Sequence, residues 1–208
     1  MNRVILSDST DETILAVTRQ HKLVDLEIEQ QINTEIVGCI YKGIVKNIVP
    51  AVDGIFVDIG IGKNAFLRRK DLLNEKRFPT EGSPILAQVI KSDTDMKGAL
   101  ITEKISMLGK YAVTLSGTSY IGVSKKIRSE SVRKRLKEIG KEICAEHMGL
   151  IIRTAAENAD MDEFRKDITR LKENWDIIQK RFRMEKSPTL LYRESDIIVK
   201  ALRDYVNK

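Results

Sequence analysis

The sequence predicts an α+β protein of several subdomains, in the order β-meander, small five-stranded β-barrel and α/β segment. Three observations predict this class. Residues 1–36 alternate as strands do, residues 37–104 contain five short β-branched runs, and residues 105–208 mix helical periodicity with strands. With 208 residues, of which 42% are hydrophobic, the chain is long enough to bury sizeable cores.

Composition and charge limit the classes of function. No apolar run approaches the roughly 20 residues that cross a bilayer, and the acidic start lacks the features of a signal peptide. We therefore expect no membrane span and a cytoplasmic location. Cys39 and Cys144 stand far apart and both histidines are solitary, so we expect reduced cysteines and no metal site. The net charge is +6, and residues 103–208 hold 23 Lys or Arg against 16 Asp or Glu. A polyanionic partner and a solvated mixed-charge surface both account for this excess.

Three alternating runs, "RVILS", "TILAVTR" and "LVDLEIE", predict a three-stranded meander in residues 1–36. Such a sheet buries one face only and needs a covering layer, which these 36 residues do not contain. Its apolar face and strand edges also make the chain a possible homo-oligomer.

Residues 37–104 predict a closed barrel, for which the five-stranded OB-fold is the best candidate. The strand-like runs are "IVGCIYKGIVKNIV", "GIFVDIG", "NAFLRR", "PILAQVIKS" and "GALITEK", with a short helix expected at residues 70–73.

Residues 105–208 predict strands at "KYAVTL", "YIGVSKK" and "GLIIRTA". A first helix is expected from about Ser129, and a long second helix from Met161 to Met184, where apolar residues recur on one stripe. Pro188 should end the second helix, and a last helix is expected near Ser195.

Phe56 and Phe66 fall on runs that become neighbouring strands if "GIGKN" is a turn, and Lys42 and Lys63 flank them. Paired rings on the outside of an OB-type barrel form a stacking platform for single-stranded bases. Alternation in such short runs leaves a second interpretation open, in which both rings belong to the barrel core.

Arg153 and Thr154 end an apolar strand. A planar guanidinium beside a hydroxyl suits a phosphate, and a surface ion pair with a carboxylate also accounts for Arg153. Two pairs of aspartates are poor metal sites without a third ligand. We expect Asp93 and Asp95 in a turn, and Asp160 and Asp162 at a helix N-terminus.

The ordered motifs resemble the RNase E/G family of endoribonucleases. Barrel residues 41–45, 56–60, 62–67, 89–91 and 97–102 are similar to its ribosomal S-one type RNA-binding domain. Four further motifs follow in the family's order: "ISMLGKYAV", "VSKKI", "GLIIRTA" and "ESDIIVKALRDY". The resemblance implies that residues 1–36 begin an RNase H-like subdomain, that residues 37–104 form the RNA-binding barrel, and that residues 105–208 form a 5′ sensor subdomain and start the return to the RNase H-like part.

The resemblance also implies roles for residues. Phe56, Phe66 and Lys97 would contact RNA, joined by Lys42 and Lys63 on charge grounds. Arg153, Thr154, Gly109 and Val113 would bind the 5′-monophosphate. Where well-studied family members have two arginines, this chain has Lys125 and Lys126, which carry charge but lack the planar fork.

The implied activity is cleavage of single-stranded RNA, preferably 5′-monophosphorylated, in RNA processing and decay. The resemblance places the family's magnesium-binding catalytic aspartates in a subdomain beyond these residues. We therefore expect no catalytic residue and no cofactor in this segment, with magnesium used by the full-length enzyme. The alternative is a non-catalytic OB-fold RNA-binding or translation-associated protein, indifferent to the 5′ end.

Overall fold

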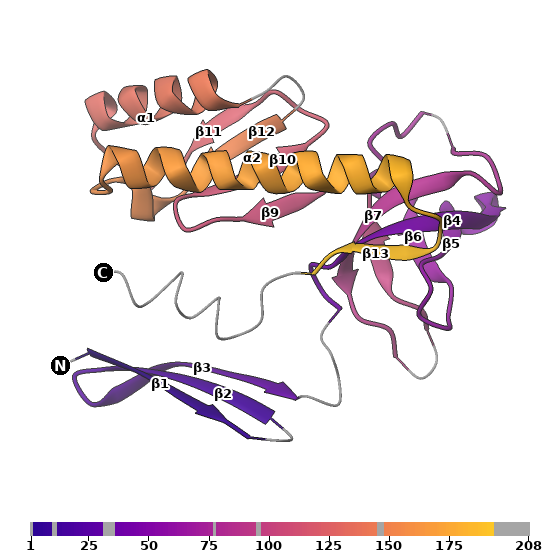
Figure 1. Ribbon diagram of the computed structural model, residues 1–208, viewed down its shortest axis with the longest axis horizontal. Coiled ribbons are helices and arrows are strands. Elements are labelled where there is room, and N and C mark those ends of the chain that lie inside the picture. The colour runs from indigo at the N-terminus through magenta and orange to yellow at the C-terminus, as the bar shows by residue number, and fades with distance from the viewer. Residues whose placement is uncertain are drawn as a thin grey trace. The chain divides into compact units, whose positions relative to one another are not determined.

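A computed structural model of the chain describes residues 2–9, 12–30, 36–76, 78–94, 97–144 and 148–193 (Figure 1). The helix expected near Ser195 and the side chain of Asp95 lie outside these described residues. The chain divides into two compact units, of which one contains residues 1–36 and the other is Val37–Arg193. In the described part of the chain, no helix combines the length and the apolar character that a bilayer crossing requires.

The first unit contains the predicted meander. Strands β1 (Asn2–Asp8), β2 (Glu12–Arg19) and β3 (Lys22–Gln30) pair antiparallel in the order β1-β2-β3. Leu15 and Val17 of the central strand are buried. Several large apolar side chains of the outer strands are 49% to 57% exposed, namely Ile5, Leu23, Val24, Leu26 and Ile28.

The second unit begins with a closed barrel, as the sequence predicts. Its strands are β4 (Ile40–Val49), β5 (Gly54–Asp58), β6 (Ala65–Arg68), β7 (Pro84–Lys91) and β8 (Leu100–Thr102). They follow the order β4-β5-β6-β8-β7, and pairing of β4 with β7 closes the barrel. Inward-facing residues are fully buried, among them Ile55, Val57, Leu67 and Ile101. Short 3₁₀ turns lie at Pro50–Val52 and at Arg69–Asp71, where the short helix was expected.

A four-stranded sheet follows the barrel. It contains β9 (Ser106–Leu108), β10 (Ala112–Ser116), β11 (Ile121–Val123) and β12 (Met148–Ile152), in the order β11-β12-β10-β9. The pair β11–β12 is parallel and the other pairs are antiparallel. The sequence analysis missed β9, since three residues are too few to show alternation.

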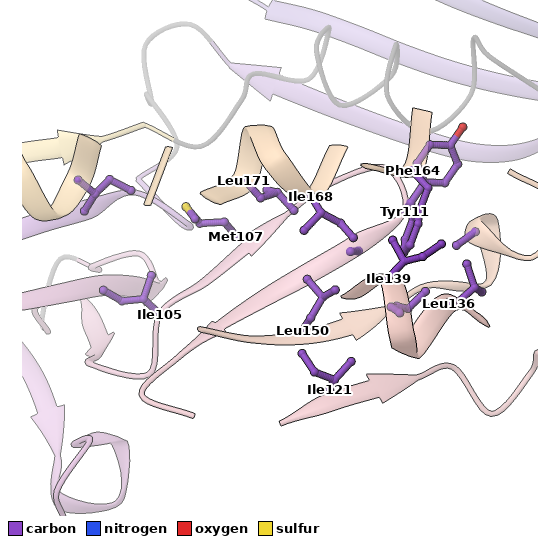
Figure 2. Close-up of a cluster of buried hydrophobic side chains, with 14 of the residues drawn as sticks. Ile105, Met107, Tyr111, Ile121, Leu136, Ile139, Leu150, Phe164, Ile168 and Leu171 are labelled. Carbon is purple, nitrogen blue, oxygen red and sulfur yellow. The ribbon is translucent and has the colours of Figure 1, made fainter. Parts of the chain in front are cut away.

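Two helices pack with this sheet (Figure 1). Helix α1 (Glu130–Ile143) begins after Ser129, whose hydroxyl caps it, and helix α2 (Met161–Met184) begins after Asp160, whose carboxylate accepts the N–H groups of Asp162 and Glu163. Phe164, Ile168 and Leu171 of α2 pack over the strands (Figure 2). Each fully buried side chain of this kind contributes roughly 1.5–3 kcal/mol, so the apolar stripe holds α2 against the sheet.

The end of α2 is tied to the barrel. Strand β13 (Thr189–Tyr192), also missed from the sequence, pairs with the first residues of β4. Arg181 donates hydrogen bonds to the carbonyls of Leu190 and Leu191, and its Nε lies 2.5 Å from the Glu185 carboxylate. Ile40 and Leu191 belong to the same buried cluster as the residues beneath α2. The buried cluster beneath α2 therefore extends to β4 and β13 at the edge of the barrel.

Glu185 gives this junction a pH dependence. The hydrogen bond from Arg181 lowers the pKa of the Glu185 carboxyl, so its contribution to stability is fully present above the unfolded pKa and is lost as pH falls through the folded pKa. Glu185→Gln should therefore lower the melting temperature most at neutral pH, and the difference from wild type should shrink in acid. Glu173→Gln, at an exposed site of the same helix, serves as the control. A difference that persists below the folded pKa would contradict this assignment.

Candidate functional site

The outer face of the barrel carries the two phenylalanines singled out from the sequence. Phe56 on β5 and Phe66 on β6 are directly opposite in register, and their ring centroids lie 5.4 Å apart at 49°. Their strand neighbours Ile55, Val57 and Leu67 point into the core. The rings are therefore partly exposed, on the face opposite the barrel core.

Both rings line an open pocket of about 540 Å³, whose other lining residues are Val52, Lys91, Ser92, Thr94, Lys97, Gly98 and Leu100. Lys91 and Lys97 add positive charge to a pocket whose lining is otherwise largely apolar. Such a site can stack planar rings and attract anions beside them. Of these residues, the sequence analysis had named Phe56, Phe66 and Lys97.

Hydrogen bonds with Thr94 position Lys97. The backbone N–H of Thr94 donates to the carbonyl of Lys97 at 2.8 Å, and the N–H of Lys97 lies 3.2 Å from the Thr94 hydroxyl. The ammonium of Lys63 donates to the Thr94 carbonyl at 2.9 Å, which brings Lys63 to the same rim.

Gly54 allows Phe66 to lie across the neighbouring strand. A Cβ at Gly54 would stand 2.2 Å from Cε2 of the Phe66 ring, a separation that real atoms do not adopt. Any side chain there would displace the ring from its place beside Phe56.

Lys42 does not join this pocket. Its ammonium donates to the backbone carbonyl of Glu185 at 2.6 Å and lies 5.1 Å from the centroid of the Phe182 ring. Lys42 thus contacts the end of α2, 143 residues away in sequence. Other cations of the barrel contact carboxylates: Lys46 with Asp58, Arg68 with Asp71 and Arg69 with Asp53.

A second cluster forms where β12 ends. Nη1 of Arg153 donates to the carbonyl of Gly109 at 2.8 Å and to that of Lys110 at 3.1 Å. The backbone N–H of Arg153 donates to the carbonyl of Tyr111, two residues before Val113 on β10. The structure therefore brings Arg153 to the turn that holds Gly109.

Thr154 meets the loop that follows β11. Its hydroxyl lies 3.0 Å from that of Ser124, and the Ser124 hydroxyl accepts the N–H of Lys126 at 3.3 Å. The side chains of Lys125 and Lys126 are exposed beside it. A guanidinium, two hydroxyls and two ammonium groups thus come from neighbouring strand ends.

The turn itself contains two groups with shifted pKa values. A hydrogen bond to Tyr111 is the largest factor that raises the pKa of Lys110, with Glu163 adding to it. Burial, followed by a hydrogen bond to Glu163, raises the pKa of Tyr111. The Lys110 ammonium lies 3.7 Å from the Glu163 carboxylate and 4.8 Å from the centroid of the Tyr111 ring.

Of the two aspartate pairs named from the sequence, Asp160 and Asp162 are both described, whereas Asp95 is not. Asp160 caps α2 and Asp162 lies in its first turn, as predicted. Within the described ranges, no group of three or more His, Cys, Asp or Glu residues lies together as metal ligands would. Cys39 and Cys144 carry unbridged thiols.

Two residues of these clusters escaped the sequence analysis. Ser124 gave no signal, since a serine after a short strand is common. Asp167 did give a signal in the sequence, because it lies on the apolar stripe of α2, between Phe164 and Leu171, where an apolar residue is expected.

Comparisons with known proteins now add to this geometry. Residues 106–208 match the model of the Ribonuclease E/G family, and residues 34–102 match that of the S1 RNA binding domain. The chain is 34% identical to Ribonuclease G of Escherichia coli K12 over 98% of its own length and 45% of the relative's. It is 35% identical to Ribonuclease E of Synechocystis over 81% of its own length and 26% of the relative's. The chain thus spans less than half the length of these curated relatives.

The aromatic pocket gives the first prediction on binding. Phe56→Ala and Phe66→Ala should each weaken binding of a single-stranded RNA by about 1–3 kcal/mol, or roughly 5- to 150-fold in Kd, because a stacked base is lost. Gly54→Ala should also weaken binding, since it moves the Phe66 ring without removing it. Fluorescence anisotropy measures each Kd.

Phe78→Leu provides the matched control, since the Phe78 ring lies over Arg69, 3.7 Å from ring centroid to guanidinium carbon, and outside the pocket. If both alanine variants bind the RNA as tightly as wild type does, the hypothesis that bases stack in this pocket is wrong.

Proposed function

The chain belongs to the ribonuclease E/G family, and we propose that it forms the RNA-binding and 5′-monophosphate-sensing part of an endoribonuclease that cleaves single-stranded RNA. The observation that carries this proposal is the cluster at the end of β12. Arg153 lies on the turn of Gly109, and Thr154 contacts Ser124 beside Lys126. A binding module indifferent to the 5′ end has no need of such a cluster.

In this proposal the barrel pocket holds the body of the RNA. The rings of Phe56 and Phe66 stack on bases, and Lys97 meets a phosphate at the rim, with Lys63 beside it. Base stacking depends little on sequence, since every base has a π-face, while the lysines make binding depend on salt. Lys42 acts through its contact with α2 rather than on the RNA.

The second cluster receives the terminal phosphate. A guanidinium has five N–H donors in a planar fork, so Arg153 can hold the turn and also bind phosphate oxygens. Thr154 supplies a hydroxyl, Gly109 and Val113 supply the neighbouring backbone, and Lys125 and Lys126 supply charge. The lysines lack the planar fork of arginine, so they attract the phosphate without fixing its orientation.

The catalytic step belongs to residues other than those described. The family resemblance implies that aspartates other than these residues hold a catalytic magnesium ion. Among the described residues, no group of three or more acidic, His or Cys side chains lies together. We propose that these residues select and hold the substrate, in the cytoplasm, for RNA processing and decay.

Association between copies is a further part of the proposal. The exposed apolar side chains of β1 and β3 form the surface that supports it. Static light scattering on the chain should give a mass that rises above 23.7 kDa with concentration. A monomer throughout would contradict association.

Discrimination of the 5′ end tests the function directly. Wild type should bind a 5′-monophosphorylated single-stranded RNA more tightly than the same RNA with a 5′-hydroxyl. Arg153→Ala should lower this preference by roughly 10- to 100-fold, because hydrogen bonds to charged groups contribute about 1.5–3 kcal/mol. Arg153→Lys should retain a part of it, and Thr154→Val should lower it less.

The control is Arg170→Ala, which removes an exposed arginine of α2. The same oligonucleotides, incubated with the 208-residue chain and magnesium, should remain uncut. Equal affinity of wild type for both RNAs would favour a binding module that ignores the 5′ end, and cleavage by the chain would place catalysis within it.

A further inference from the structure

We propose that Asp167 is a positioning residue for the 5′-phosphate site, acting on Arg153 through the backbone of the turn at Gly109. The inference rests on the function proposed for Arg153. Asp167 does not touch Arg153 directly. Asp167 accepts hydrogen bonds from the N–H groups of two peptides in this turn, and Arg153 donates to the carbonyl groups of the same two peptides.

The carboxylate of Asp167 accepts two backbone N–H groups. Oδ1 lies 3.2 Å from the nitrogen of Lys110, and Oδ2 lies 2.8 Å from that of Tyr111. Helix α2 delivers this carboxylate from a fixed position, since Phe164 and Ile168 on either side of it are fully buried. Charge-assisted hydrogen bonds of this kind are about twice as strong as neutral ones.

The same two peptide groups bind Arg153. The peptide joining Gly109 to Lys110 donates its N–H to Asp167 and offers its carbonyl to Nη1 of Arg153 at 2.8 Å. The next peptide, joining Lys110 to Tyr111, donates to Asp167 and accepts from Nη1 at 3.1 Å. In a trans peptide the N–H and C=O point in opposite directions. Two parallel peptide groups therefore stand between a carboxylate and a guanidinium.

This arrangement has an electrostatic consequence. The negative carboxylate polarises each N–H, which makes the carbonyl at the other end of that peptide a stronger acceptor for the guanidinium. Asp167 thereby fixes the position of Nη1, and with it the plane of the whole fork. The contact through two peptide groups orients the guanidinium and leaves the Asp167 carboxylate on the far side of the turn.

Gly109 is the residue that permits this contact. A Cβ at this position would stand 2.6 Å from Oδ2 of Asp167 and 2.8 Å from Cδ1 of Leu171. Only glycine lets the turn lie so close to α2. The side of the turn is also fixed, since the ring of Tyr111 meets that of Phe164 edge-on at 6.4 Å (Figure 2) and its hydroxyl donates to Glu163 at 2.6 Å.

Asp167→Asn tests the inference in the 208-residue chain. The amide keeps the shape but replaces one acceptor oxygen with an N–H donor and removes the charge. The ratio of affinities for 5′-monophosphate and 5′-hydroxyl versions of one single-stranded RNA should fall about tenfold. Affinity for the 5′-hydroxyl RNA reports whether the barrel is intact. Asp176→Asn, at an exposed site of α2, is the matched control and should leave the ratio unchanged.

A double-mutant cycle separates positioning from a merely structural role. If Asp167 acts through Arg153, then Asp167→Asn in the Arg153→Ala background should change the ratio no further. Gly109→Ala, whose added Cβ would push against the Asp167 carboxylate, should lower the ratio as Asp167→Asn does, and it replaces that variant if the asparagine protein fails to fold.

The outcomes are distinct. A wild-type chain without preference for the 5′-phosphate overturns the proposed function and this inference together. A preference that Arg153→Ala abolishes but that Asp167→Asn and Gly109→Ala both retain overturns this inference alone. If the two substitutions lower the affinity ratio additively in the double variant, the inference is also overturned, because Asp167 then acts independently of Arg153.

Discussion

The packing of α2 against the sheet of β9 to β12 is the constraint on which the second unit depends. Phe164, Ile168 and Leu171 hold the helix on the strands, and the same helix presents Asp167 to the turn before β10. Its last turn reaches the barrel through Arg181, Glu185 and the carbonyl that accepts Lys42. One helix thus contacts the turn beside Arg153, where phosphate binding is proposed, and reaches the barrel at its last turn.

The two candidate sites solve different physical problems. The barrel pocket uses exposed rings on rigid strands, so it can hold bases of any sequence. The cluster at Arg153 uses donors on strand ends and a turn, so it can recognise one terminal group with a defined geometry. Both belong to one compact unit, in keeping with the proposal that a single RNA strand is bound at its end and along its length.

Charge placement follows the same division. Several cations near the barrel contact carboxylates or carbonyls, as Lys46, Arg69 and Lys42 do, and they stabilise the scaffold. Lys91 and Lys97 line the pocket, and Lys125 and Lys126 stay exposed beside Thr154. The basic excess noted in the sequence is therefore shared between a structural and a proposed binding role.

The sequence by itself determined most of the elements and their order, although not β9 or β13. The meander, the barrel strands, the Asp160 cap and both ends of α2 follow from local periodicity and capping, which depend on residues a few positions apart. Tertiary structure decided the rest. Alternation could not tell whether Phe56 and Phe66 face outward until β5 and β6 paired in register. The contact of Lys42 with Glu185 and the peptide groups between Asp167 and Arg153 join residues far apart in the chain. No local pattern encodes such contacts, because they arise only when packing brings the segments together.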